Sequence, residues 1–143
     1  MNGTQGFEHD VPHGCAMFVR TGKAERCEVM ITDAKTFYAQ WPSRMSHAKA
    51  SAPDAVKGFG TLYQTVMKEG ALDVREKELV ALGIGLAVRC EGCIYAHVEK
   101  ALKAGATRQQ IMEAGGVAVM MQGGPTYTYL PKLVEALDAL EKA

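Results

Sequence analysis

Four residues in the second half of the chain have side chains suited to redox or proton-transfer chemistry: Glu78, Cys90, Cys93 and His97. On a helix that begins near Cys90, the two cysteines and His97 fall at positions i, i+3 and i+7 and share one face. Two thiols one turn apart can close a disulfide. The helix N-terminus favours the thiolate form. His97, one turn after Cys93, can accept its proton because an unperturbed imidazole titrates near about pH 6.5.

Glu78 is the unusual residue on its own predicted helix, which spans about Val74 to Arg89 and is apolar nearly all round from Leu79 to Val88. Such a helix is expected to be central, with neighbours on every side. A carboxylate at its edge is costly unless it has a partner. Glu78 is therefore expected to orient His97, directly or through water, or to receive its proton.

The chain must turn back between these two groups. A continuous helix would separate Glu78 from Cys90 by about 18 Å. The sequence therefore predicts a break between Arg89 and Gly92, with Gly92 as the residue that permits it.

Zinc binding is the alternative that these side chains leave open. Cys90, Cys93 and His97, with or without Glu78, could hold zinc in a non-enzymatic binding module. Structural zinc sites usually take their ligands from loops on two elements, which favours the redox interpretation. A third interpretation is a structural oligomer in which these residues are idle. Haem attachment is excluded, because Ile94 and not histidine follows Cys93.

A second, weaker metal hypothesis concerns the N-terminal region. Cys15 and Cys27 together with His9 and His13 could form a metal site, although their spacing matches no standard zinc finger. Small buried or exposed thiols are the favoured interpretation of these two cysteines.

The elements that must position the four residues are predicted to be helices, which gives an all-α body of about six helices with sequential helices as antiparallel neighbours. Capping boxes at Asp73/Glu76 and Thr107/Gln110 mark two of the starts. The predicted helices cover Asp33 to about Arg44, Pro53 to Glu69, about Val74 to Arg89, about Cys90 to Ala104, Thr107 through Met121, and a last helix through Leu130 to Leu140.

Apolar periodicity also predicts which residues are buried. The helix from Pro53 is expected to bury one stripe, and Trp41 to pack in the core or at a subunit contact. The pairs Met120-Met121 and Gly115-Gly116 are assigned to core packing. The predicted stripe consists of Val56, Phe59, Leu62, Tyr63, Val66 and Met67.

Residues 1–32 differ from the rest in having no helical period. They are expected to form an N-terminal arm in front of a helical domain of residues 33–143. Two β-compatible runs, Ala16–Arg20 and Cys27–Thr32, flank a turn-like tripeptide and allow a short β-hairpin.

Length and composition restrict the class of protein. The chain has 143 residues, 48% of them hydrophobic, which is enough to fold as one domain without a metal or disulfide. Lys plus Arg and Asp plus Glu both number 16, so nucleic acid and anionic membranes are not expected as partners. The polar start lacks signal-peptide character, and no apolar run is long enough for a membrane span, so a cytoplasmic location is expected.

The stretch LDVREKELVALGIGLAVRCEGCIYAHVEKALKAGATRQQIMEA, with Gly123-Gly124-Pro125 and the amphipathic tail after it, resembles the carboxymuconolactone decarboxylase superfamily, in particular its alkylhydroperoxidase D-like branch. The resemblance covers roughly residues 53–140. It implies an all-helical subunit that assembles with copies of itself, with a hexamer favoured over a trimer. It also implies a cysteine pair that cycles between dithiol and disulfide.

The resemblance further implies catalytic roles for four residues. Cys93 would attack the peroxide, Cys90 would resolve the product as a disulfide, and Glu78 and His97 would relay the proton. The substrate would be a small hydroperoxide or disulfide, and an external dithiol would supply electrons without a bound cofactor. One position differs: Gly92 stands where alkylhydroperoxidase D has a histidine. The decarboxylases of the superfamily lack the cysteine pair, so decarboxylation is disfavoured.

Overall fold

The computed structural model describes residues 33–141 and is all-helical over that range, as the sequence predicted. The N-terminal arm, with its proposed hairpin and the metal hypothesis for Cys15 and Cys27, lies outside the described residues. The boundary at residue 33 therefore stays a prediction. The helices are α1 (Ala34–Ser51), α2 (Pro53–Met67), α3 (Val74–Ala87), α4 (Glu91–Lys103), α5 (Arg108–Gln122), α6 (Gly124–Tyr127) and α7 (Leu130–Glu141).

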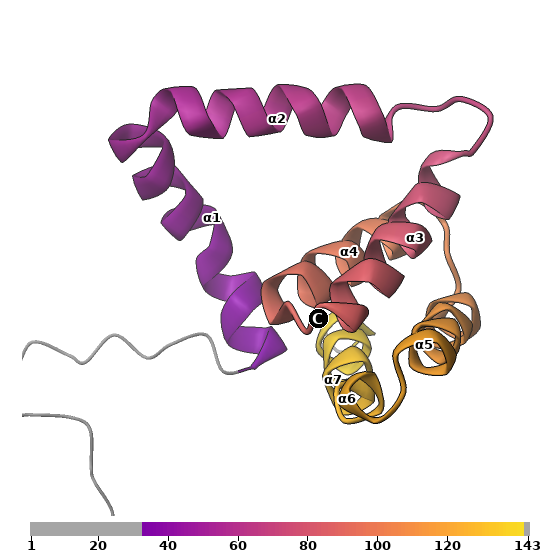
Figure 1. The fold of residues 1–143 in the computed structure, drawn as a ribbon. Helices are drawn as coiled ribbons and strands as arrows, with labels where there is room; N and C mark the ends of the chain where they lie inside the picture. Colours follow the sequence, from indigo (N-terminus) through magenta and orange to yellow (C-terminus); the bar gives the residue numbers. More distant parts are fainter. Residues whose placement is uncertain (1–32, 142–143) are drawn as a thin grey trace, which may run out of the picture.

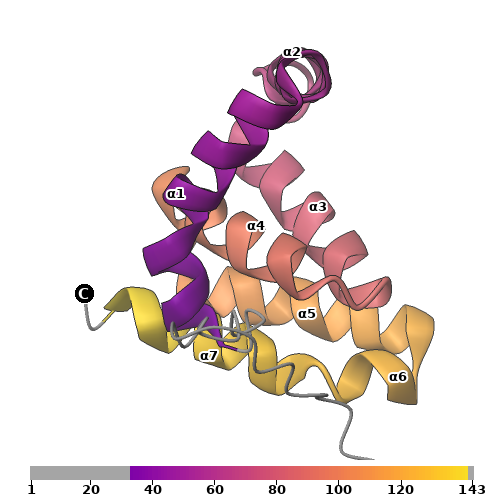
Figure 2. The same ribbon diagram turned by 90° about the vertical axis from the view of Figure 1, so that its left-hand side faces the viewer.

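Helices α3 to α7 form a packed body, whereas α1 and α2 form an arm that extends from it. Figure 1 shows α1, α2 and the α3–α4 pair as three sides of a triangle, with α5, α6 and α7 beyond the third side. Figure 2, turned by 90°, shows α2 far from α5 and α7. No helix within the described range is both long and apolar enough to cross a membrane.

The hydrophobic core lies between α3, α4, α5 and α7, and the first turns of α1 cover one end of it. Phe37 from α1 is 2% exposed and packs against the buried ring of Tyr95 on α4. The Ala34 amide donates to Glu135 on α7, which fixes the start of α1 to the body. The fully buried large apolar side chains include Leu82, Leu86, Ile94, Val98, Ile111, Leu133 and Leu137.

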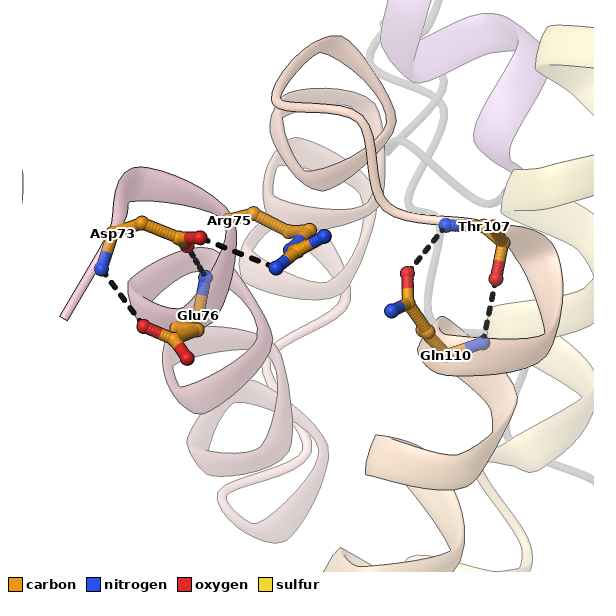
Figure 3. A network of polar contacts seen from close by, with 5 residues as sticks. All are labelled: Asp73, Arg75, Glu76, Thr107 and Gln110. Atoms are coloured by element: carbon orange, nitrogen blue, oxygen red, sulfur yellow. Dashed lines mark hydrogen bonds and ion pairs between the residues drawn. The ribbon is translucent and has the colours of Figure 1, made fainter.

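Both predicted capping boxes are present, and they fix where α3 and α5 begin (Figure 3). At α3, the Asp73 carboxylate accepts from the Glu76 amide at 2.7 Å while the Glu76 side chain accepts from the Asp73 amide at 2.8 Å. Thr107 and Gln110 make the same reciprocal pair at 3.2 and 2.9 Å. Each box satisfies two backbone donors that the first turn of a helix leaves without a partner.

One predicted helix differs from the structure in its extent, and one short helix was not predicted. Helix α1 continues to Ser51, well beyond the predicted end near Arg44, and it contains Pro42. A proline removes only one backbone bond, and the alanines that follow favour continuation. The chain turns instead at Ala52, before Pro53 opens α2. The one-turn helix α6 was not predicted, and it follows the break at Gly123, where φ is 76°.

The predicted burial of α2 is wrong, because no residue of this helix is buried in the single chain. Phe59, Leu62 and Val66 are 69%, 59% and 55% exposed. Helical periodicity identified the apolar face correctly, but the α1–α2 arm holds that face away from the body.

Helix α3 likewise has neighbours on only part of its surface. Val80, Ile84 and Val88 repeat at intervals of four residues and are 56%, 59% and 63% exposed. Met120 and Met121 on α5, assigned to the core from sequence, are also exposed. These residues form apolar stripes on two helices that pack against each other.

Candidate active site

The chain reverses direction between α3 and α4 at a Schellman motif centred on Arg89. The Cys90 amide donates to the Gly85 carbonyl at 3.0 Å, and the Arg89 amide donates to the Leu86 carbonyl at 3.0 Å. Arg89 has a φ of 58°, the left-handed conformation that glycine usually supplies. The predicted break is therefore present, but Gly92 does not make it: Gly92 lies inside the first turn of α4.

Cys90 caps α4 and forms a disulfide with Cys93, with their Cα atoms 5.2 Å apart. The Cys90 Sγ atom accepts from the Cys93 amide at 3.3 Å. Both cysteines are partly buried. The pair thus lies at the positive end of the α4 dipole, where a thiolate is favoured after reduction.

Gly85 on α3 allows α4 to approach closely at the disulfide. A Cβ atom at this position would lie 3.2 Å from the Cys93 Cβ and 3.6 Å from the Cys93 carbonyl carbon. The carbonyl of Gly85 also holds the Cys90 amide. This glycine therefore helps to set the position of both sulfur-bearing residues.

Glu78 and His97 are in direct contact beside this pair. Glu78 Oε2 lies 2.6 Å from His97 Nδ1, and the Glu78 side chain is only 2% exposed. A carboxylate in its ionised form can only accept hydrogen bonds, so with that form of Glu78 the hydrogen of this contact is on Nδ1. When His97 is neutral, Nε2 is then the nitrogen with a free lone pair. His97 lies one helical turn after Cys93 on α4 and is 18% exposed.

Tyr63 is a third member of this cluster that sequence reasoning missed. Its hydroxyl, on α2, donates to the second oxygen of Glu78, Oε1. Burial, the hydrogen bond to Glu78 and the negative charge of that carboxylate together raise the pKa of Tyr63. The residue looked like one more member of the apolar stripe on α2. The available signal was that a tyrosine, unlike the other members, needs a polar partner when it is covered.

The arrangement brings all four predicted residues into one region at the facing ends and sides of α3 and α4. The four residues form two pairs: a covalent bond joins the two cysteines, and a hydrogen bond joins Glu78 to His97. Over residues 33–141 no group of three or more His, Cys, Asp or Glu side chains is arranged to hold a metal ion. The geometry is that of a disulfide pair one helical turn before a histidine that is hydrogen-bonded to a buried carboxylate.

Comparison with known sequences places the matched region across α2 to α7. The model of the carboxymuconolactone decarboxylase family matches residues 53–141. The chain is 41% identical over 98 residues to uncharacterized protein 4 in the cox locus of Paracoccus denitrificans, covering 68% of this chain and 86% of that protein. It is 30% identical over 111 residues to an uncharacterized protein of Cupriavidus necator, covering 78% and 98%.

Solved structures show the same architecture. A carboxymuconolactone decarboxylase family protein from Legionella pneumophila matches with a TM-score of 0.67 and 35% identity over 76% of this chain and 95% of that one. A family member from Thermotoga maritima, described as possibly involved in antioxidative response, matches with a TM-score of 0.66 and 27% identity, covering 73% and 90%. With its helical fold and these matches, the chain belongs to the carboxymuconolactone decarboxylase family.

Proposed function

We propose that this protein is a thiol-dependent peroxidase or disulfide oxidoreductase, with Cys93, Cys90, His97 and Glu78 as its catalytic groups. The observation that carries the proposal is the Cys90–Cys93 disulfide at the start of α4, one turn before a histidine bonded to a buried carboxylate. A dithiol needs a base to become nucleophilic near neutral pH, and His97 is the base in reach of Cys93 along the helix.

The proposed cycle starts from the reduced pair. His97 Nε2 takes the proton of the Cys93 thiol, while Glu78 keeps the other ring nitrogen protonated and stabilises the imidazolium. The Cys93 thiolate attacks the terminal oxygen of a hydroperoxide, so an S–O bond forms and the O–O bond breaks. The departing alkoxide takes the proton from His97 and leaves as an alcohol. Cys93 is now a sulfenic acid.

Cys90 completes the oxidative half of the cycle. Its sulfur displaces hydroxide from the Cys93 sulfenic acid, which releases water and gives the disulfide. An external dithiol then returns two electrons and two protons to the pair and becomes a disulfide itself. The sequence gives no reason to expect a bound cofactor for this cycle. The antioxidative description of the Thermotoga maritima relative is in keeping with it.

We further propose that the protein is a homo-oligomer, with a hexamer favoured over a trimer. The exposed residues Val80 and Ile84 of α3, with Val88 at its C-cap, belong to a helix that packs against α5, which exposes Val117 and Met120. Large exposed apolar side chains gathered on two packed helices are typical of subunit contacts. Light scattering coupled to gel filtration tests this, and a single-chain mass at micromolar concentration would contradict it.

The test of the redox function is intact-mass analysis of reduced protein before and after one equivalent of a small organic hydroperoxide. Replacing Cys15 and Cys27 with serine confines the reaction to the α4 pair. We expect loss of two hydrogens, reversal by a dithiol, and a peptide map joining Cys90 to Cys93. Cys93→Ser should abolish the reaction, and Cys90→Ser should stop it at a trappable sulfenic acid. Unchanged mass with unreactive thiols would contradict the proposal.

A further inference from the structure

Tyr63 is the point at which the α1–α2 arm contacts the buried carboxylate. Glu78 uses its two oxygens in different directions: Oε1 accepts from the Tyr63 hydroxyl on α2, and Oε2 contacts His97 Nδ1 on α4. Tyr63 is partly buried, whereas Phe59, Leu62 and Val66 of the same helix are exposed. The side chain that α2 turns toward the body is therefore a polar donor to the relay.

Lys100 holds the Tyr63 ring from the α4 side. Its ammonium nitrogen lies 4.0 Å from the centroid of the ring. Lys100 follows His97 by three residues on the same helix, so the two side chains project from neighbouring positions. A cation at this distance over an aromatic face is attracted to it. The ring is thus fixed by its hydroxyl at one end and by a cation over its face.

Two bonds on one carboxylate restrict its orientation more than one bond does. With Oε1 held by Tyr63, rotation of the Glu78 carboxylate away from His97 breaks both hydrogen bonds. We propose that Tyr63 is a positioning residue of the thiol relay. It holds Glu78 so that Oε2 faces His97 Nδ1, which keeps the hydrogen on Nδ1 and leaves Nε2 to accept the Cys93 proton. The proposal rests on the redox function above, and it gives the α1–α2 arm the role of positioning Glu78.

The groups around the relay support a neutral, donating phenol. Glu78 faces the phenol from α3 and Lys100 faces its ring from α4, while His97 of α4 contacts the other oxygen of Glu78. Burial and the neighbouring carboxylate raise the pKa of Tyr63 above the usual tyrosine range. The hydroxyl therefore keeps its hydrogen throughout the neutral and mildly alkaline range in which a thiol relay works.

Tyr63→Phe tests the proposal by removing only the donor. Tyr38→Phe is the matched control, because it also removes one hydroxyl that donates a hydrogen bond, here to the Tyr95 backbone carbonyl at 2.9 Å and not to Glu78. The measurement is the rate of Cys93 alkylation by iodoacetamide against pH in reduced protein lacking Cys15 and Cys27. Thermal unfolding of each variant establishes that it is folded.

We expect Tyr63→Phe to slow alkylation at neutral pH by about tenfold and to move the midpoint of the profile about one pH unit upward. The rate at high pH should be retained, because the thiolate then forms without help. Nitrogen NMR of labelled histidine should show His97 losing part of its Nδ1–H tautomer in Tyr63→Phe. Tyr38→Phe should match the parent in its alkylation rates, in the midpoint of the pH profile and in the His97 tautomer. A Tyr63→Phe profile equal to that of Tyr38→Phe would overturn the proposal.

A double-mutant cycle tests whether Tyr63 acts through Glu78. In a Glu78→Gln background, Tyr63→Phe should add little further effect, since the carboxylate to be positioned is gone. A full second tenfold loss would contradict the proposal. Alkylation also separates this proposal from the redox function. Protein that alkylates rapidly at Cys93 but leaves hydroperoxide unchanged would refute the peroxidase while still testing Tyr63.

Discussion

Glu78 Oε2 and His97 Nδ1 lie 2.6 Å apart, although the two residues are 19 positions apart in the chain. The contact exists because α3 and α4 turn back on each other at Arg89 and pack along their lengths. A single hydrogen bond between neighbouring helices thus connects the most buried carboxylate of the described chain to the histidine one turn after Cys93.

Removing the charge of Glu78 should reduce thiol activation. Glu78→Gln keeps the shape of the side chain but replaces an anionic acceptor, so the His97 imidazolium loses its partner. We expect a loss of about 10²-fold in peroxide reduction and in neutral-pH alkylation of Cys93. Glu69→Gln, at an exposed position between α2 and α3, is the control and should be unchanged. Stopped-flow measurement of peroxide consumption checks both variants. Equal rates for Glu78→Gln and the parent protein would show that Glu78 takes no part in activating the thiol.

The two adjacent glycines of α5 should respond in opposite directions to alanine. A Cβ at Gly115 would lie 2.7 Å from Leu133 Cδ2 and 3.3 Å from Leu130 Cδ2, in the buried contact between α5 and α7. Nothing lies within 4 Å of a Cβ at Gly116, which is exposed. Gly115→Ala should lower the free energy of unfolding by about 1–2 kcal/mol despite the helix-propensity gain.

Gly116→Ala should raise the free energy of unfolding by up to about 1 kcal/mol, because alanine favours the helix and meets no neighbour. Urea unfolding of both variants at equal protein concentration measures the difference. Similar stabilities for the two variants would mean that α5 and α7 do not pack as closely as described.

Replacing Arg89 should stabilise the fold. An L-residue with a side chain in the left-handed conformation costs about 1 kcal/mol, and glycine avoids that cost. Arg89→Gly should therefore raise the unfolding free energy by about 1 kcal/mol. Gly105, with φ of 88°, ends α4 in the same way, since the Ala106 amide donates to the Ala101 carbonyl. Gly105→Ala should accordingly destabilise by about 1 kcal/mol in the same urea assay, and a gain there would contradict this account.

The contribution of Tyr38 to the free energy of unfolding should become measurable at alkaline pH. Burial first, and then the charge of Glu99, raise the pKa of this phenol above its usual value of 10.0. The folded state therefore holds a proton that the unfolded chain releases above about pH 10, so stability is full below that pH and falls above it.

In Tyr38→Phe that part of the alkaline loss should disappear. The slope of unfolding free energy against pH should become shallower by up to about 1.4 kcal/mol per pH unit between pH 10 and 11. Urea titrations of both proteins across this range provide the measurement. Parallel slopes would show that Tyr38 ionises equally easily in the folded and unfolded states.

Local sequence rules predicted the helices well wherever the signal was contained within one turn. The boxes at Asp73 and Thr107 are confirmed because each needs only residues three positions apart. The break before Cys90 could also be inferred, since Glu78 and His97 cannot meet across a straight helix. The residue at which the chain turns could not be inferred. Arg89 adopts the left-handed conformation, and the glycine three positions later remains helical.

What sequence periodicity could not supply was the partner of each apolar face. The stripe on α2 has the correct period, but the helix stands away from the body, so the face identified from Phe59 and Leu62 stays open. For the same reason Tyr63 was grouped with apolar residues. Its contact with Glu78 depends on how α2 lies against α3, which is a property of the tertiary packing and not of the spacing within α2.

The Schellman junction also has a kinetic consequence. The amide of Cys90 is bound to Gly85 in α3, and the residue itself caps α4, so its backbone is held from both sides. The disulfide between the two sulfurs can therefore open and close without movement of the backbone. Each sulfur is held near the other, which gives their reaction a high effective molarity. In the proposed cycle, an adduct between Cys93 and an external thiol would be resolved by Cys90 before a second external molecule arrives. Mixed disulfides with the reductant should accordingly be short-lived, and they should accumulate only when Cys90 is replaced.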